Sequence, residues 1–324
     1  MAEEKEWKLP AELQPKPEDV GYDLDAVLSA VVGLRSEIPE DAFTASILGT
    51  ERTGNGVVIR DDGLVLTVGY LITEAETIWL STAKGTVVAG HPMAYDQATG
   101  FGIVQALGKL GVPAIQRGTA ADCRRGDQVI VAGHGGRRRA LKAHVVAKRE
   151  FAGYWEYVLD EAIFTVPAHP NWGGTAVVDA QGRLTGIGSL LVQERIEDKE
   201  IQGNMIVPID PLEPILDDLL RYGRVNRPPR PWLGIYATEF NKRLVVAGMA
   251  KGGPADRAKI EVGDMVLAVA GDKVIGLADL FRKIWAQGRA GVEVKLTLMR
   301  GAERVETSVR SVDRSDFLKK PKLH

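Results

Sequence analysis

The residues that could support nucleophilic chemistry gather in one glycine-rich stretch, AHPNWGGTAVVDAQGRLTGIGSL, at positions 168–190. His169 lies near its start and Ser189 near its end. A serine hydroxyl attacks a carbonyl only when an imidazole accepts its proton and a carboxylate orients that imidazole. Because no acidic residue is obviously placed to orient His169, the sequence gives a Ser189–His169 pair only weak support.

The single cysteine is a second candidate nucleophile. Cys123 precedes a predicted strand in ADCRRGDQVIVAG, where a half-buried packing residue is the favoured interpretation. The neighbouring Arg124 and Arg125 would lower a thiol pKa, which keeps the alternative open. One cysteine excludes an intrachain disulfide. Since His134 and His144 lack metal-ligand spacing, the sequence predicts no metal site and no cofactor.

Composition and charge exclude several classes of partner. The 324 residues carry a net charge of -2, with 45% hydrophobic and 26% charged residues, which is typical of a globular protein. One basic stretch, GGRRRALKAHVVAKRE at 135–150, has no interleaved aromatic residues, so a solvated loop and strand edge is favoured over a nucleic-acid patch. We expect no nucleic-acid partner and no membrane partner.

The amino terminus has no apolar segment of the signal-peptide kind, and no stretch approaches the roughly 20 apolar residues of a membrane span. The sequence as written predicts a cytoplasmic location, with a periplasmic one as the alternative if a leader has been removed.

The elements that must position these residues are short. Between about 43 and 208, apolar runs punctuated by glycine predict an antiparallel barrel or sandwich. TGNGVVIRDDGLVLTVGYLI predicts two strands around an Asp62-Gly63 turn. Leu212, Ile215, Leu219 and Leu220 have the spacing of an amphipathic helix, which Gly223 would end. After a proline-rich linker, strands and a helix LADLFRKIWAQG predict a second module.

Four motifs in this order, followed by such a module, resemble the HtrA/Deg family. They are GNGVVIRDDGLVLT, DQATGFGIV, RGDQVIVAG and NWGGTAVVDAQGRLTGIG. The resemblance implies a mostly β protein: a chymotrypsin/trypsin-like double six-stranded β-barrel followed by a PDZ-like α+β domain. The implied divisions are an N-terminal arm at 1–24, the protease-fold domain at 25–222, the linker at 223–230, the PDZ domain at 231–312 and a basic tail at 313–324.

The resemblance also locates the catalytic positions, and none holds its usual residue. The general base is matched by Tyr70, the orienting aspartate by Gly100 and the nucleophile by Trp172. A phenol with a pKa near 10 is a poor base at neutral pH, and an indole forms no acyl-enzyme. Pro170 stands where a backbone N–H would serve the oxyanion hole, and proline has no N–H.

We therefore expect a pseudoprotease that binds peptide C-termini or unfolded proteins as a scaffold, adaptor or chaperone-like factor. A serine-type hydrolase with a relocated site is the alternative. The rings of Tyr70 and Trp172 are expected either to pack together in the old cleft or to cover the core independently.

The second module resembles a PDZ domain in its carboxylate-binding loop and groove helix. In PDZ domains, backbone N–H groups of the loop capture a peptide C-terminal carboxylate, and the peptide adds as a strand to the sheet edge. The residues matched here are Trp232, Leu233, Gly234, Ile235, Leu277, Leu280, Phe281 and Ile284. Lys259 departs from the family pattern, where glycine is usual. The resemblance further implies a homo-oligomer, a trimer.

Overall fold

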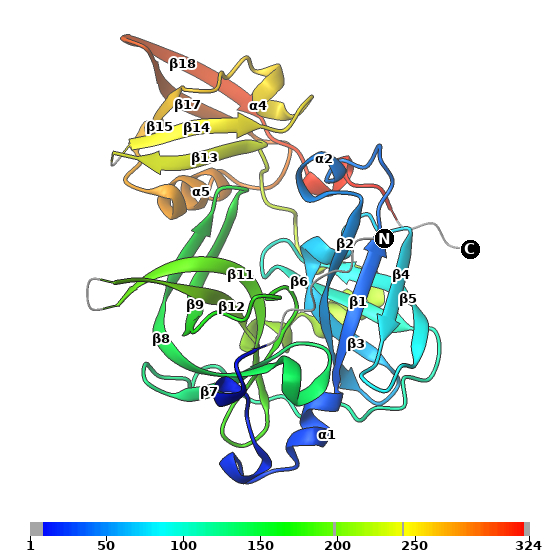
Figure 1. The fold of residues 1–324 in the computed structure, drawn as a ribbon. Helices are drawn as coiled ribbons and strands as arrows, with labels where there is room; N and C mark the ends of the chain where they lie inside the picture. Colours follow the sequence, from blue (N-terminus) through cyan, green and yellow to red (C-terminus); the bar gives the residue numbers. More distant parts are fainter. Residues whose placement is uncertain (1–8, 197–198, 242, 321–324) are drawn as a thin grey trace, which may run out of the picture. The chain divides into compact units, whose positions relative to one another are not determined.

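The computed structural model describes residues 9–196, 199–241 and 243–320 (Figure 1). Contacts divide the chain into two compact units. The first holds the described residues of Met1–Arg149, Glu161–Val225 and Lys319–His324, and the second holds Glu150–Asp160 and Asn226–Leu318. The second unit therefore takes its residues from two separate parts of the sequence.

The first unit begins with a closed barrel of six antiparallel strands, in the order β1-β2-β3-β6-β5-β4. The Asp62-Gly63 turn joins β2 to β3 as predicted, with Gly63 at a φ of 84° that a side chain would oppose. All five residues of β3 are buried, so both faces of this strand are covered. The strands are β1 Val31–Glu37, β2 Glu51–Arg60, β3 Leu64–Val68, β4 Thr77–Ser81, β5 Val87–Tyr95 and β6 Phe101–Ala106.

A second closed barrel of six strands follows, in the order β10-β11-β12-β9-β8-β7. Together the two barrels confirm the predicted double-barrel fold. The strands are β7 Gln128–Ala132, β8 Ala140–Gly153, β9 Tyr157–Val166, β10 Ala176–Val178, β11 Leu184–Ile196 and β12 Lys199–Pro208. Because β8 and β9 extend past Arg149 and before Glu161, the tip of their hairpin belongs to the second unit.

Helices of the first unit are short. The Asp23 side chain caps α1, Leu24–Ser29, by accepting a hydrogen bond from the Ala26 N–H, and β1 follows directly. The predicted amphipathic helix is split into η5, Asp210–Leu212, and α3, Leu216–Tyr222, and it ends at Gly223 in the left-handed conformation. The others are α2 Ala45–Leu48, η1 Ala11–Leu13, η2 Pro17–Asp19, η3 Gly69–Leu71 and η4 Gly136–Arg139.

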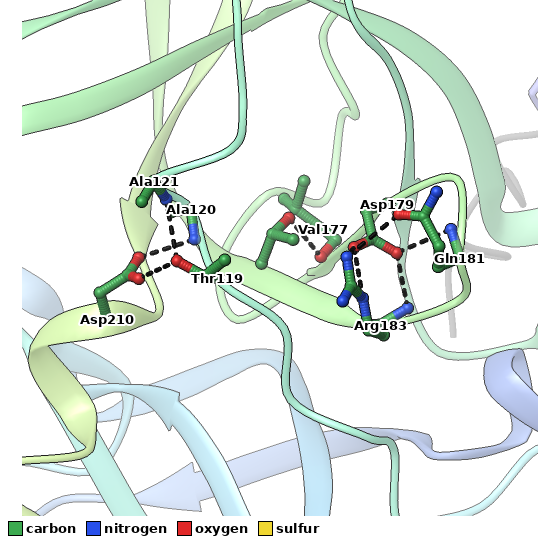
Figure 2. A network of polar contacts seen from close by, with 9 residues as sticks. Thr119, Ala120, Ala121, Val177, Asp179, Gln181, Arg183 and Asp210 are labelled. Carbon is green, nitrogen blue, oxygen red and sulfur yellow. Dashed lines mark hydrogen bonds and ion pairs between the residues drawn. The ribbon is translucent and has the colours of Figure 1, made fainter.

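Side-chain hydrogen bonds hold the turn between β10 and β11 (Figure 2). The Asp179 carboxylate accepts from the backbone N–H groups of Gln181 and Arg183, both at 2.9 Å, and from the Arg183 guanidinium. At the other side of Figure 2, Asp210 accepts from the Thr119 hydroxyl and from the Ala120 N–H. The bonds of Asp179 fix the hairpin of β10 and β11, and those of Asp210 join η5 to the segment before β7.

The second unit is a sheet in the order β13-β14-β15-β17-β18, with β16 paired to β15 and two helices. Its core contains Leu233, Ile235, Leu280, Phe281 and Ile284, all fully buried. The predicted strands and helices are all present: β13 Ile235–Phe240, β14 Arg243–Met249, α4 Pro254–Arg257, β15 Met265–Val269, β16 Asp272–Lys273, α5 Leu277–Trp285, β17 Glu293–Arg300 and β18 Glu303–Arg310, followed by η6 Arg314–Phe317.

Lys259 keeps the backbone shape that a glycine would adopt at its position. Its φ is 59°, in the left-handed region that opposes most side chains. Arg300 donates a hydrogen bond to the Lys259 carbonyl and pairs with Asp264 and Glu261. The turn is thus held by a side-chain clamp despite the substitution. Among the described residues, no helix is long and apolar enough to cross a membrane.

Candidate functional site

The glycine-rich loop between β9 and β10 rests on one buried side chain of the first barrel. The Asn55 amide donates hydrogen bonds to the carbonyls of Asn171, at 3.0 Å, and Gly173, at 2.9 Å. Its oxygen accepts from the His134 N–H at 2.8 Å. A Cβ at Gly174, where φ is 77°, would lie 1.8 Å from the Asn55 carbonyl oxygen. The loop therefore requires glycine at 174 because it lies directly against β2.

Trp172 is linked to Tyr70 at the point of the loop where the resemblance places a nucleophile. The Trp172 side chain acts to lower the pKa of the Tyr70 phenol, as an indole N–H near the phenol oxygen does, since indole has only a donor. The Tyr70 hydroxyl in turn donates to the Ser189 carbonyl at 2.8 Å. Burial raises the pKa of Tyr70 above its ordinary value of 10.0, so its phenol stays protonated at neutral pH.

This contact differs in kind from the one expected. The Trp172 side chain affects the pKa of the Tyr70 hydroxyl, but among the ring contacts of the described residues none joins Tyr70 to Trp172. Both residues are half-buried. The hydrogen bond from the Tyr70 hydroxyl to the Ser189 carbonyl connects η3 and β11.

The turn containing Gly100 lies beside η3. The carboxylate of Asp96 accepts from the Thr99 N–H and hydroxyl, and the Gly100 carbonyl accepts from the Gly69 N–H at 2.7 Å. Gly100 has a φ of 82°, which an aspartate rarely adopts. The three positions matched to a catalytic triad are therefore brought into one region, with no carboxylate at the third.

A buried network of polar side chains is hydrogen-bonded to η3. Arg52 donates to the Tyr70 carbonyl at 2.7 Å and to the Thr44 hydroxyl at 2.8 Å. That hydroxyl donates to Glu74, which also accepts from the Thr44 and Lys319 N–H groups. Burial opposes the charge on Glu74, but these bonds outweigh it and lower the pKa of its carboxyl. Burial also lowers the pKa of Arg52 to about 10, so it stays charged at neutral pH.

His169 supports the loop from inside. It is fully buried, its Nδ1 accepts from the Asn171 N–H at 3.2 Å, and its Nε2 lies 2.9 Å from the Arg139 carbonyl oxygen, to which it must donate. Burial lowers its pKa below 6.5, so the ring is neutral. Since both ring nitrogens are used in this way, the geometry leaves neither for the Ser189 hydroxyl.

Two further sequence interpretations are settled by burial and pairing. Cys123 lies in the core of the second barrel, where burial raises the pKa of its thiol, so the packing interpretation is confirmed. In the basic stretch, Arg137 pairs with Asp25 and Lys142 with Asp19. These contacts fit the interpretation of that stretch as a solvated loop and strand edge.

In the second unit, the predicted carboxylate loop binds a carboxylate of the same chain. The backbone N–H groups of Leu233, Gly234 and Ile235 donate to the side chain of Glu156, at 3.2, 2.7 and 3.1 Å. Gly234 has a φ of 74°, which turns successive amides toward one point. Burial raises the pKa of Glu156 to about 7, although the three amides act to lower it.

The other predicted groove residues differ in how deeply they are buried. Trp232 is buried and packs against Phe317 with 5.1 Å between ring centroids. On α5, Leu280, Phe281 and Ile284 belong to the unit's core, while Leu277 is half-buried. Sequence reasoning missed Glu156, whose only signal was its place in an aromatic-rich turn, FAGYWEYV.

Comparison with known families finds a match in each half of the chain. The trypsin-like peptidase domain family matches residues 54–187, and the PDZ domain family matches residues 231–310. A trypsin-like peptidase domain followed by a PDZ domain makes the chain similar to proteases of the HtrA/Deg family.

Curated relatives of this HtrA-like chain are named as proteases. It is 19% identical over 328 residues to "Serine protease Do-like HtrA" of Bacillus subtilis, with 91% of this chain and 72% of that protein covered. It is 26% identical over 297 residues to "Protease Do-like 1, chloroplastic" of Arabidopsis thaliana, with 84% and 66% covered. With a DegP-like endoprotease of Pseudomonas putida strain W619, described as probable and periplasmic, the identity is 25%, and the alignment covers 55% of that protein.

Solved structures share the fold. A variant of the HtrA-type protease AlgW with a tripeptide is 20% identical, with a TM-score of 0.54 and coverage of 92% of this chain and 97% of that one. The serine endoprotease from Yersinia pestis is 20% identical, with a TM-score of 0.52 and coverage of 91% and 99%. Because the identities are low, this likeness shows the architecture alone.

A hydrogen bond from the Trp172 indole to the Tyr70 oxygen predicts energetic coupling between the two side chains. Tyr70→Phe and Trp172→Phe each remove one partner, and a buried hydrogen bond contributes about 0.5–1.5 kcal/mol. We expect the double variant to lose less unfolding free energy than the sum of the single losses, by that amount. Chemical denaturation measures it. Tyr222→Phe, on an exposed tyrosine, is the control, and additive losses for Tyr70 and Trp172 would show that the bond does not contribute.

The neutral His169 should make stability depend on pH. Its folded pKa lies below the ordinary value of 6.5, so the unfolded chain binds a proton more readily than the folded one. Stability is therefore full above about pH 6.5 and falls as pH decreases toward the folded pKa.

We expect His169→Gln to flatten this decline between about pH 7 and 5, measured by urea denaturation at a series of pH values. The matched control is His144→Gln, at an exposed position on β8. An unchanged decline in His169→Gln would show that another group causes it.

Proposed function

We propose that this HtrA-like chain is a pseudoprotease that acts by binding proteins or peptide C-termini. The observation that carries the proposal is Trp172 at the matched nucleophile position beside Tyr70 at the matched base position, whose hydroxyl is used in a bond to the Ser189 carbonyl. Neither group forms an acyl-enzyme, and a phenol whose pKa is raised by burial does not act as a base at neutral pH. Relatives are named serine proteases, so the proposal separates this chain from them.

Two backbone features support the loss of activity independently of the side chains. Pro170 lacks the N–H that the resemblance assigns to the oxyanion hole, and one such donor is worth about 10²–10³ in rate. Gly100 has a left-handed backbone, so an aspartate placed there would be strained. Recovering catalysis therefore requires changes in both side chains and backbone.

Binding is supported by the second unit. It matches the PDZ domain family, it has three loop amides directed at a carboxylate, and one neighbouring structure is described with a bound tripeptide. Such a loop recognises a peptide by its terminal carboxylate. A scaffold, adaptor or chaperone-like role follows from this binding. The trimer implied by the family resemblance stays a prediction, which sedimentation of the full chain tests. The cytoplasmic and periplasmic locations also stay predictions.

Restoring the nucleophile alone should not restore proteolysis. We expect Trp172→Ser to show no casein cleavage above wild type and no labelling by a fluorophosphonate probe, because Tyr70, Gly100 and Pro170 remain. An active HtrA protease run in parallel is the positive control. Cleavage by this single variant would contradict the loop chemistry proposed here.

The same probe tests the alternative of a relocated hydrolase. Labelling of the wild-type chain that Ser189→Ala abolishes would establish a serine-type site and overturn the proposal. Labelling that persists in Ser189→Ala would locate the reactive residue elsewhere.

Peptide binding should depend on a free C-terminus. We expect the full chain to bind members of an array of peptides ending in free carboxylates, and to bind the same peptides much more weakly when they are amidated. Fluorescence anisotropy measures each affinity. Equal binding of both forms would show that the loop does not recognise C-termini.

A further inference from the structure

The site for a peptide carboxylate is already occupied by a side chain of this protein. Glu156 is only 4% exposed, and its carboxylate accepts hydrogen bonds from three successive backbone amides. A terminal carboxylate of a peptide would need the same three donors. Since these amides cannot serve both groups fully at once, Glu156 and a peptide compete for the loop.

The chain around Glu156 imitates a bound peptide beyond its carboxylate. Two residues earlier, the Tyr154 carbonyl accepts a hydrogen bond from the Ala237 N–H of β13 at 3.3 Å. β13 is the edge strand of its sheet, where an added strand would pair. Two residues later, Val158 is buried in the apolar cluster that includes the core residues of α5. One short segment thus meets the amide loop, the sheet edge and the apolar cluster.

The segment is held by contacts of two kinds. Arg282, on α5, forms ion pairs with Glu150 and Asp160, which lie at the two ends of the hairpin tip. The side chains of all three residues are at least 45% exposed, and exposed pairs contribute little to stability. Ring contacts add to them: Tyr154 packs edge-on against Tyr236 at 6.0 Å.

The buried position of Glu156 has free-energy costs, from backbone strain and from burial of a carboxylate, that an apolar residue would avoid. Its φ is 61°, in the left-handed region that a glutamate rarely adopts. Burial raises the pKa of its carboxyl despite the three amides, so the site holds the charged group at a cost. These features suit an occupant that can leave.

We propose that Glu156 is an internal ligand of the PDZ-like domain, and that a peptide with a free C-terminal carboxylate binds only by displacing it. This inference rests on the proposed recognition of C-termini and names its regulation. The hairpin tip, Glu150–Asp160, keeps the loop closed to weak ligands. A partner that binds well enough releases the tip, so occupancy of the loop is reported through β8 and β9.

The first experiment measures hydrogen exchange in the full chain without any peptide. In Glu156→Ala, the amides of Leu233, Gly234 and Ile235 lose their acceptor, and we expect their exchange to accelerate at least tenfold. Glu156→Gln keeps an acceptor oxygen and should fall between Glu156→Ala and wild type. Glu161→Ala is the matched control, because Glu161 is exposed on β9 and pairs with Lys148. Unchanged exchange in Glu156→Ala would overturn the internal ligand.

The second experiment measures binding of a peptide array whose members end in Val, Leu, Ile, Phe or Ala with a free carboxylate, beside amidated copies. We expect Glu156→Ala to bind carboxylate peptides at least tenfold more tightly than wild type, and Glu161→Ala to match wild type. Arg282→Ala, which loosens the tip without touching the loop, should give a smaller gain and covers the case in which Glu156→Ala fails to fold.

The outcomes separate this inference from the proposed function. If wild type and the Glu156 and Arg282 variants bind carboxylate peptides equally, the internal ligand is overturned while recognition of C-termini stands. If no variant binds any peptide of the array, the proposed recognition fails, and the inference fails with it. Tighter binding by Glu156→Ala that amidation abolishes supports both.

Discussion

The buried amide of Asn55 is the contact on which the first unit depends. It lies on β2 of the first barrel, donates to two carbonyls of the loop from the second barrel, and accepts from the His134 amide that follows β7. Backbone carbonyls buried without a donor are costly, so loss of this one side chain would leave several groups unpaired at once. Glycine is needed at 174 because the loop approaches β2 closely, and a side chain at Gly173 would meet the Tyr70 hydroxyl. The shape of the loop is thus set by packing, whatever residue stands at its centre.

The hydroxyl of Tyr70, at the matched base position, is used within the protein, where it donates to the Ser189 carbonyl. A working base must be available to substrate, so this pairing is part of the case for the proposed loss of activity. Paired polar groups of this kind contribute to stability, in line with the trade-off between activity and stability at functional sites. The buried Arg52 and its partners extend this paired network behind η3.

Local patterns predicted much of the fold and part of the site. The Asp62-Gly63 hairpin followed from turn chemistry, since the residues that decide it are adjacent in sequence. The matched triad positions followed from motif order, but the form of the Tyr70–Trp172 contact did not, because it depends on where the Ser189 carbonyl lies in space. The bond between Glu156 and Gly234 joins residues 78 positions apart, and no periodicity or turn residue encodes it.

The division of the chain into two units determines what is lost when the PDZ-like module is cut out of it. The polypeptide passes between the units after Arg149, Asp160, Val225 and Leu318, so no single cut separates them. A PDZ-like module excised after the proline-rich linker would leave behind the hairpin that supplies Glu156, and would arrive in a new protein with its amide loop open. The same excision would remove the Lys319 amide from Glu74 in the first unit. Under the proposed role of Glu156, exchange of this module would transfer the amide loop without the side chain that occupies it.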